Sequence, residues 1–125
     1  MEINIKLLCY DINLLPPSLN PLSNEFKDFR FETFKDHLIN YDIIALQELY
    51  CRMNDRTPKL LQEANNMLLR FNSVPKKYST FSGFLLDSGL LNLSKFQIVK
   101  TEFTPFKYSA GKDSYVYKGM LYSKI

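Results

Sequence analysis

Apolar runs and helix-like spacing alternate along the first part of the chain. Residues 3–10, INIKLLCY, are apolar and partly β-branched and precede a proline-rich stretch, LLPPSLNPL, so they predict a first strand. Residues 25–40, EFKDFRFETFKDHLIN, contain neither glycine nor proline and predict a helix. The helix face expected to pack on a sheet holds Phe31, Phe34 and Leu38, with Phe26 near its edge and Phe29 off it.

The same two-part pattern follows a second time. Residues 42–48, DIIALQE, predict a short apolar strand, and residues 57–72, TPKLLQEANNMLLRFN, predict a second helix. Thr57 is expected to be the N-cap of this helix and Pro58 its first residue, where the missing N–H is not needed. The apolar stripe of the helix is expected to hold Leu60, Leu61, Ala64 and Leu68.

After Pro75 the pattern changes to short aromatic or β-branched runs separated by turn residues. The predicted strands are residues 77–83, 89–96, 97–103 and 114–125. In the second of them, Gly89 allows a tight entry, and Leu91 and Leu93 face one side. Two strand–helix units followed by hairpin-like strands predict an α/β domain with a mixed sheet. The last predicted strand reaches Ile125, so a sheet that continues beyond this chain, or an open sheet edge, is expected.

Composition fits a single folded domain. The chain has 125 residues, 46% of them hydrophobic, and a net charge of +3 from 16 basic and 13 acidic side chains spread along its length. This charge is too weak and too mixed to indicate binding to nucleic acid or to an anionic membrane. The one adjacent basic pair, Lys76 and Lys77, is expected to lie in a solvated turn.

The cysteines and the N-terminus carry no targeting or redox signal. Cys9 and Cys51 have no spacing typical of zinc or redox sites, so buried, reduced thiols are expected. Charged residues interrupt the apolar N-terminal stretch, and no segment has the length of a transmembrane helix. An intracellular, cytoplasmic protein is therefore expected.

Two carboxylates follow predicted strands. Asp11 closes the first strand and Glu48 the second, and the carboxyl ends of neighbouring parallel strands meet at one edge of a sheet, where ligands bind. Carboxylates there suit Mg²⁺, which prefers oxygen ligands. The alternatives are a salt bridge from Glu48 to Arg52 and a turn in which the Asp11 side chain bonds the backbone.

The chain shows few other candidates for chemistry. His37, the sole histidine, is expected in the last turn of the first helix, where the helix dipole favours it. There is no Gly-rich phosphate loop and no Ser-His-Asp set. An imidazole base near Glu48 would have to come from outside these residues.

Four motifs, in order, carry a family resemblance: IKLLCYDINLLPP, YDIIALQELYCR, DSGLLNLSKFQIV and YKGMLYSKI. Together they resemble the N-terminal half of the endonuclease/exonuclease/phosphatase superfamily, in particular its neutral sphingomyelinase-like branch. The resemblance implies a partial deoxyribonuclease I-like α/β sandwich with a mixed β-sheet and two main helices, with residues 1–125 forming the N-terminal half of the domain. It also implies a Mg²⁺-dependent phosphodiesterase.

The resemblance assigns roles to two residues. Glu48 matches the metal-binding Glu of the LQE motif, and Asp11 stands at the position of a catalytic Asn. Asn can donate a hydrogen bond to a phosphate oxygen, whereas an ionised Asp only accepts. The Thr-His, Gly-Asp-Phe-Asn and Ser-Asp-His elements of the family's second half, which supply acid/base groups, are absent from the sequence.

Two functions are therefore expected of the chain. One is a Mg²⁺-dependent phosphodiesterase, truncated and weakly active or inactive as given, acting on a phosphodiester such as a phospholipid headgroup. Nucleic acid is a further substrate within the family, although the charge does not indicate it. The alternative is a non-enzymatic half-domain that binds a partner through its open sheet edge. The proline-rich loop beside Asp11 is either a lipid contact or a stiff surface loop.

Overall fold

The computed structural model describes residues 2–14, 26–50, 54–75 and 84–125. Several predictions lie outside these ranges: those for the proline-rich loop after Leu14, for Cys51 and Arg52, for the Lys76–Lys77 pair and for the whole strand at 77–83. The elements in chain order are β1 (Leu7–Asp11), α1 (Lys27–His37), η2 (Leu38–Asn40), β2 (Ile43–Gln47), α2 (Arg56–Asn66), β3 (Phe71–Ser73), β4 (Leu91–Ser94), β5 (Lys100–Pro105), η3 (Gly111–Tyr115) and β6 (Gly119–Lys124).

The predicted mixed sheet is confirmed. The four-stranded sheet has the order β1-β2-β4-β3, with β1 parallel to β2 and the other pairs antiparallel. The helix α1 connects the two parallel strands, as such a crossover requires. Strands β5 and β6 form a separate antiparallel pair.

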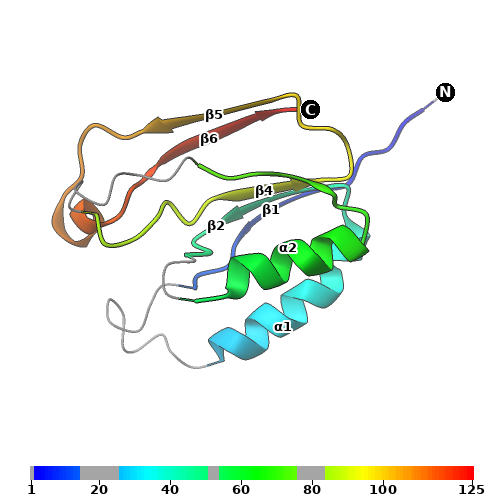
Figure 1. Ribbon diagram of the computed structural model, residues 1–125, viewed down its shortest axis with the longest axis horizontal. Helices are drawn as coiled ribbons and strands as arrows, with labels where there is room; N and C mark the ends of the chain where they lie inside the picture. Colours follow the sequence, from blue (N-terminus) through cyan, green and yellow to red (C-terminus); the bar gives the residue numbers. More distant parts are fainter. Residues whose placement is uncertain (1, 15–25, 51–53, 76–83) are drawn as a thin grey trace.

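The elements form three layers (Figure 1). Helices α1 and α2 cover one face of the four-stranded sheet, and the β5–β6 pair lies over the other face. Polar contacts join the two sheets, because Asn92 of β4 donates a 2.8 Å hydrogen bond to the Ser123 hydroxyl of β6. The main core lies between the helices and the sheet, and its fully buried residues include Leu38, Ile44, Leu60, Ala64 and Leu93. The chain thus has the expected α/β sandwich with two main helices.

The first helix follows its predicted pattern. Phe31, Phe34 and Leu38 are buried against the sheet, whereas Phe26 and Phe29 are exposed. Phe29 therefore belongs to the solvent side of α1, as its position off the stripe indicated. The helix ends at His37 and continues as the short helix η2.

The second helix differs from its prediction at both ends. It begins at Arg56 with Asp55 as N-cap, so the assignment of Thr57 as N-cap was wrong. The Asn54 side chain accepts the Arg56 backbone N–H at 3.0 Å, and the helix starts at Arg56, two residues before the predicted first residue Pro58. The helix ends at Asn66, because Leu68 has a left-handed backbone and is exposed, and residues 71–73 pair with β4 as strand β3.

Strand β1 is the outer strand of the sheet and is mostly exposed. It begins at Leu7 rather than at residue 3, and Leu7 is 62% exposed. Cys9 is exposed, so the prediction that it is buried was wrong. The apolar sequence gave no sign of this exposure, since it results from the place of β1 at the edge of the described sheet.

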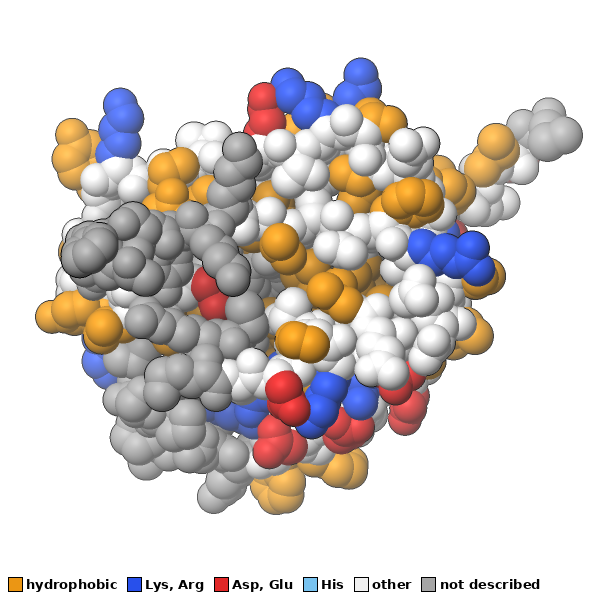
Figure 2. All heavy atoms as spheres, in the orientation of Figure 1, with side chains coloured by type: hydrophobic (Ala, Val, Ile, Leu, Met, Phe, Trp, Pro, Cys, Tyr) orange, Lys and Arg blue, Asp and Glu red, His pale blue; other side chains and the backbone are white. Residues whose placement is uncertain are grey.

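Charges of both signs are mixed over the helices, and Figure 2 shows acidic and basic side chains side by side on this face. Several of them form surface ion pairs, among them Arg56–Asp28 and Lys59–Asp55. The mixture agrees with the weak net charge. Within the described residues, no helix has the length and apolar character needed to cross a membrane.

Candidate metal centre

Asp11 and Glu48 lie at adjacent strand ends, as predicted. The register pairs Asp11 with Gln47, so Glu48 is the next residue along the neighbouring strand. The pairing continues beyond β1, because the Ile12 N–H donates to the Gln47 carbonyl at 3.1 Å and the Leu14 N–H donates to the Glu48 carbonyl at 2.8 Å. The two carboxylates therefore lie at the same end of the sheet, where β1 and β2 end, and hydrogen bonds fix the backbone there.

Glu48 has an unusual backbone conformation. Its φ of 55° lies in the left-handed region, which costs a non-glycine residue on the order of 1–2 kcal/mol. Such strain persists only where the surroundings enforce it, and it is found most often at functional sites. Here the Leu14 N–H holds the Glu48 carbonyl on one side, and on the other the Leu49 N–H donates to the Gly89 carbonyl at 2.9 Å.

Gly89 makes this arrangement possible. Its φ of 66° is also left-handed, and a Cβ at this position would lie 3.0 Å from Glu48 Cα and 3.1 Å from Tyr50 Cε1. The tight turn predicted at Gly89, before the strand that holds Leu91 and Leu93, is thus confirmed. The contact with Glu48 was not predicted, because nothing in the sequence pattern relates the two segments.

Asp11 forms the turn that the sequence offered as an alternative. Its Oδ1 accepts the backbone N–H of Asn13 at 2.9 Å, and Asn13 then adopts a left-handed φ of 48°. A carboxylate has about four lone-pair sites, so one backbone hydrogen bond leaves capacity for a cation. The turn and metal binding are therefore compatible.

The surroundings of Glu48 disfavour its charge. Partial burial raises the pKa of the Glu48 carboxyl, and the nearby charge of Asp11 raises it further. Lys118 opposes this effect, although its Nζ also forms a 2.9 Å ion pair with Asp113. Asp113 and Lys118 were not candidates from the sequence, because no pattern brings residues 113–118 to this strand end.

Replacing Glu48 by glutamine is expected to raise the melting temperature at pH 7 in the absence of divalent cations. A carboxyl whose pKa is higher in the folded chain than its ordinary 4.5 favours folding below that ordinary pKa, and this contribution is lost as the pH rises through the raised value. Glutamine stays neutral at every pH. The gain should therefore disappear near pH 4, as measured by circular dichroism.

Glu102→Gln serves as the control. Glu102 is exposed and pairs with Lys100 at 2.7 Å, so its replacement should leave the melting temperature unchanged or slightly lower at pH 7. A Glu48→Gln variant that is less stable than the parent at pH 7 without cations would contradict the account of Glu48.

Tyr50 is a buried neighbour of the site that the sequence did not single out. Its side chain packs with Leu86 and Val116 in a small second core. Burial raises the pKa of its hydroxyl, and the charge of Glu48 raises it further, so the ring stays neutral. Tyr50 and Glu48 both lie close to Gly89.

The other candidates lie elsewhere. His37 is in the last turn of α1, as predicted, at the end of the helix that leads into β2 and away from the carboxylates. It lines a mostly apolar hollow of about 300 Å³ between β1 and α1, whose walls include Leu8, Tyr10 and Phe34. The expected salt bridge to Arg52 falls outside the described residues.

The residues present fit a hard cation that keeps most of its waters. Across the described ranges, no three His, Cys, Asp or Glu side chains cluster as a closed metal cage would require. Glu48 and Asp11 offer two carboxylates, the number with which proteins commonly hold Mg²⁺. Burial is the main reason why the pKa of Glu48 is raised, and a cation between the two carboxylates would offset the second reason, the charge of Asp11.

Comparison with known proteins finds relatives in sequence and in fold. No protein-family model matches the chain. The sequence is similar to a sphingomyelinase from Dictyostelium discoideum, with 32% identity over 106 residues, which are 83% of this chain and 23% of the relative. The fold matches sphingomyelinase C from Streptomyces griseocarneus with a TM-score of 0.75 and 23% identity, over 95% of this chain and 43% of that one. The chain therefore resembles sphingomyelinases in sequence over part of their length and shares their deoxyribonuclease I-like fold in part, and we refer to it as sphingomyelinase-like in this sense.

Further solved structures share this fold. A β-hairpin deletion mutant of beta toxin from Staphylococcus aureus matches with a TM-score of 0.77 and 20% identity, over 98% of this chain and 46% of that one. A beta toxin variant with bound magnesium ions matches with a TM-score of 0.71 and 22% identity, over 97% of this chain and 44% of that one. The sphingomyelinase-like chain thus spans less than half the length of each of these proteins.

Proposed function

We propose that the sphingomyelinase-like chain is the Mg²⁺-binding part of a phosphodiesterase that acts on phospholipid headgroups. The observation that carries the proposal is the pair Asp11 and Glu48 at adjacent strand ends, with Glu48 held in a left-handed conformation. The name of the Dictyostelium relative supports sphingomyelin as the substrate class. The magnesium ions of the beta toxin variant support the choice of metal.

Each residue of the proposed site has a defined task. When bound, Mg²⁺ supplies positive charge that offsets the negative charge of the phosphodiester and its leaving oxygen. Glu48 holds the ion, and Gly89 with the backbone of Leu14 fixes the position of Glu48. Asp11 adds a second carboxylate and, unlike Asn, offers no N–H to the substrate. In the family that the sequence resembles, the acid/base groups belong to second-half elements that residues 1–125 do not contain.

A chimera tests this function. In sphingomyelinase C from Streptomyces griseocarneus, the part matched by this chain would be replaced by residues 1–125. The chimera should hydrolyse sphingomyelin in a Mg²⁺-dependent manner, and Glu48→Gln in the chimera should lower the rate by about 10² or more. Asp11→Asn should raise turnover, because the amide can donate to the phosphate.

The control in the chimera is Glu102→Gln, which lies on β5 and should leave the rate unchanged. A folded chimera whose Mg²⁺-dependent rate is unaffected by Glu48→Gln would exclude Glu48 as the ligand. A chimera that cleaves other phosphodiesters but not sphingomyelin would support the metal site and exclude sphingomyelin as the substrate.

The cytoplasmic location expected from the N-terminal sequence stays a prediction.

Partner binding is a second candidate function, and the open edge of β1 favours it. This strand pairs only with β2 among the described strands, and its side chains are mostly exposed. The hollow beside it, between β1 and α1, is mainly apolar. A strand added to β1 could place an apolar side chain there. Hydrogen exchange of the β1 amides, which should slow when a partner binds, tests this function.

A further inference from the structure

The connection between β5 and β6, residues 106–118, carries three exposed aromatic side chains. Tyr108 is 92% exposed, Phe106 is 56% exposed and Tyr115 is 50% exposed. Large apolar groups gathered on one short segment mark an interaction site more often than single ones do. We call these three side chains the aromatic rim.

The base of this connection is firmly anchored. The Phe106 N–H donates to the Lys118 carbonyl at 2.9 Å and closes the connection. Val116 is buried with Tyr50 and Leu86, and the Leu85 N–H donates to the Tyr115 carbonyl at 2.8 Å. The ring of Tyr117 packs against Phe103, with 5.2 Å between ring centroids. The aromatic rim thus projects from a fixed support.

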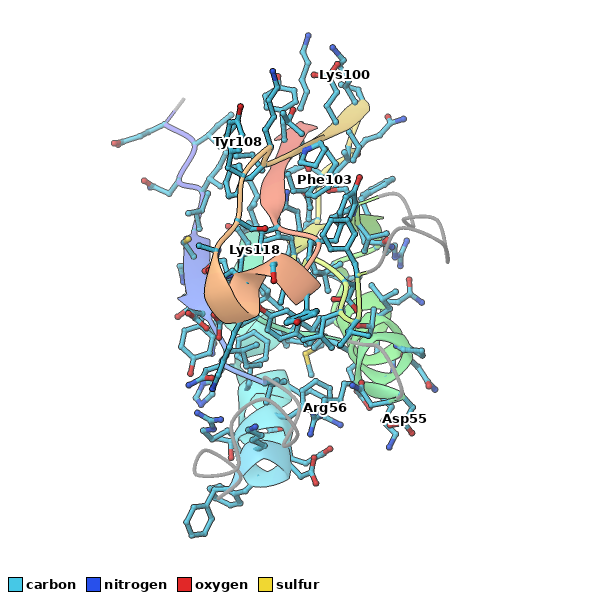
Figure 3. The ribbon with its side chains drawn as sticks, turned by 90° about the vertical axis from the view of Figure 1, so that its left-hand side faces the viewer. Asp55, Arg56, Lys100, Phe103, Tyr108 and Lys118 are labelled. Carbon is cyan, nitrogen blue, oxygen red and sulfur yellow. The ribbon has the colours of Figure 1, made fainter. Side chains whose placement is uncertain are left out.

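The rim lies at the same end of the molecule as the candidate metal centre. Figure 1 shows η3 at the end toward which β1 and β2 point, and Figure 3 looks onto that end with Tyr108 and Lys118 labelled. The charges of Asp113 and Lys118 both act on the Glu48 carboxyl. The connection that carries the rim therefore reaches the surroundings of Glu48 through Asp113 and Lys118.

Basic side chains accompany the rim. Lys107 and Lys112 are exposed on the connection, and Asp113, the one acid within it, is paired with Lys118. Aromatic rings with adjacent lysines suit the interface of a phospholipid bilayer, where rings enter the headgroup layer and lysines meet phosphates. The rings and lysines of residues 106–118 therefore indicate membrane binding, which the net charge of the whole chain did not indicate.

We propose that the aromatic rim docks the chain on a phospholipid bilayer, so that headgroups lie next to Glu48. The proposal deepens the proposed function by naming the surface on which the substrate is met. A bilayer fits better than a protein partner, because the lysines next to the aromatic rim carry a positive charge that complements the lipid phosphates.

Co-sedimentation with vesicles tests the proposal, with EDTA present so that metal binding plays no part. The chain should sediment with phosphatidylcholine vesicles and more strongly when phosphatidylserine is included. The Phe106→Ser/Tyr108→Ser double variant should bind about tenfold less to both. Lys107→Gln should weaken binding only to the vesicles that contain phosphatidylserine, by about fivefold.

A matched control lies on the outer face of β6. Met120 is 60% exposed and Tyr122 is 51% exposed, comparable to Phe106, but they lie outside the connection. The Met120→Ser/Tyr122→Ser double variant should bind vesicles as the parent does. Equal losses in the two double variants, or no sedimentation of the parent chain, would overturn the proposal. A chain that forms dimers instead would make the rim a protein interface and would also overturn it.

The vesicle experiment is independent of the metal site. Glu48→Gln should bind vesicles as the parent chain does, and the rim variant should bind Mg²⁺ as the parent chain does. A parent chain that binds Mg²⁺ but does not sediment with vesicles would therefore remove the docking proposal alone. A parent chain that sediments with vesicles but does not bind Mg²⁺ would remove the proposed function alone.

Discussion

Gly89→Ala is expected to destabilise the chain by about 2–5 kcal/mol and to weaken Mg²⁺ binding at the same time. The left-handed φ of Gly89 costs alanine about 1–2 kcal/mol, and the new Cβ would lie 3.0 Å from Glu48 Cα, which adds about 1–3 kcal/mol of crowding. Because the crowded atom belongs to the backbone of Glu48, relief of the contact moves the proposed ligand. Urea unfolding and Mg²⁺ titration measure the two effects.

Gly111→Ala is the matched control. Gly111 has a similar φ of 60°, but a Cβ there would have no atom within 4 Å. It should therefore show at most the backbone cost of about 1–2 kcal/mol and unchanged Mg²⁺ binding. Equal effects of the two substitutions on both measurements would show that Gly89 does not position Glu48.

Leu93→Ala is expected to cost about 2–5 kcal/mol of the free energy of unfolding. Leu93 is fully buried and lies in β4, which pairs with β2 on one side and β3 on the other. The substitution leaves a cavity where the sheet meets the main core. Since small domains are stable by about 5–15 kcal/mol, this loss should shift the urea midpoint strongly.

Leu7→Ala makes the same chemical change on the exposed edge strand β1. Because Leu7 is largely in solvent, the expected loss is below about 1 kcal/mol. A Leu7→Ala variant as unstable as Leu93→Ala would mean that β1 is covered in solution, by a second copy or another segment. The comparison therefore also reports on the open edge of the sheet.

The sequence predicted those features that depend on local pattern. The spacing of Phe31, Phe34 and Leu38 predicted both the helix and its buried face. The positions of Asp11 and Glu48 after apolar runs predicted that they would lie at adjacent strand ends, because a helix between two strands usually makes them parallel neighbours.

The features that depend on distant contacts were missed. Strand β3 follows helical spacing in the sequence and exists because residues 71–73 pair with β4. Cys9 has an apolar neighbourhood in the sequence, yet it is exposed at the edge of the sheet. The left-handed backbone of Glu48 and its contact with Gly89 arise where two distant segments meet, so no single segment could indicate them.

The central claim is that Glu48 holds a divalent cation, and isothermal titration of the chain with Mg²⁺ at pH 7 tests it most directly. The parent chain and the Glu102→Gln control should bind Mg²⁺ weakly and equally, whereas Glu48→Gln should bind at least about tenfold more weakly or give no heat. Circular dichroism would establish that the variant is folded. Unchanged Mg²⁺ binding in folded Glu48→Gln would contradict the assignment of Glu48 as the metal ligand.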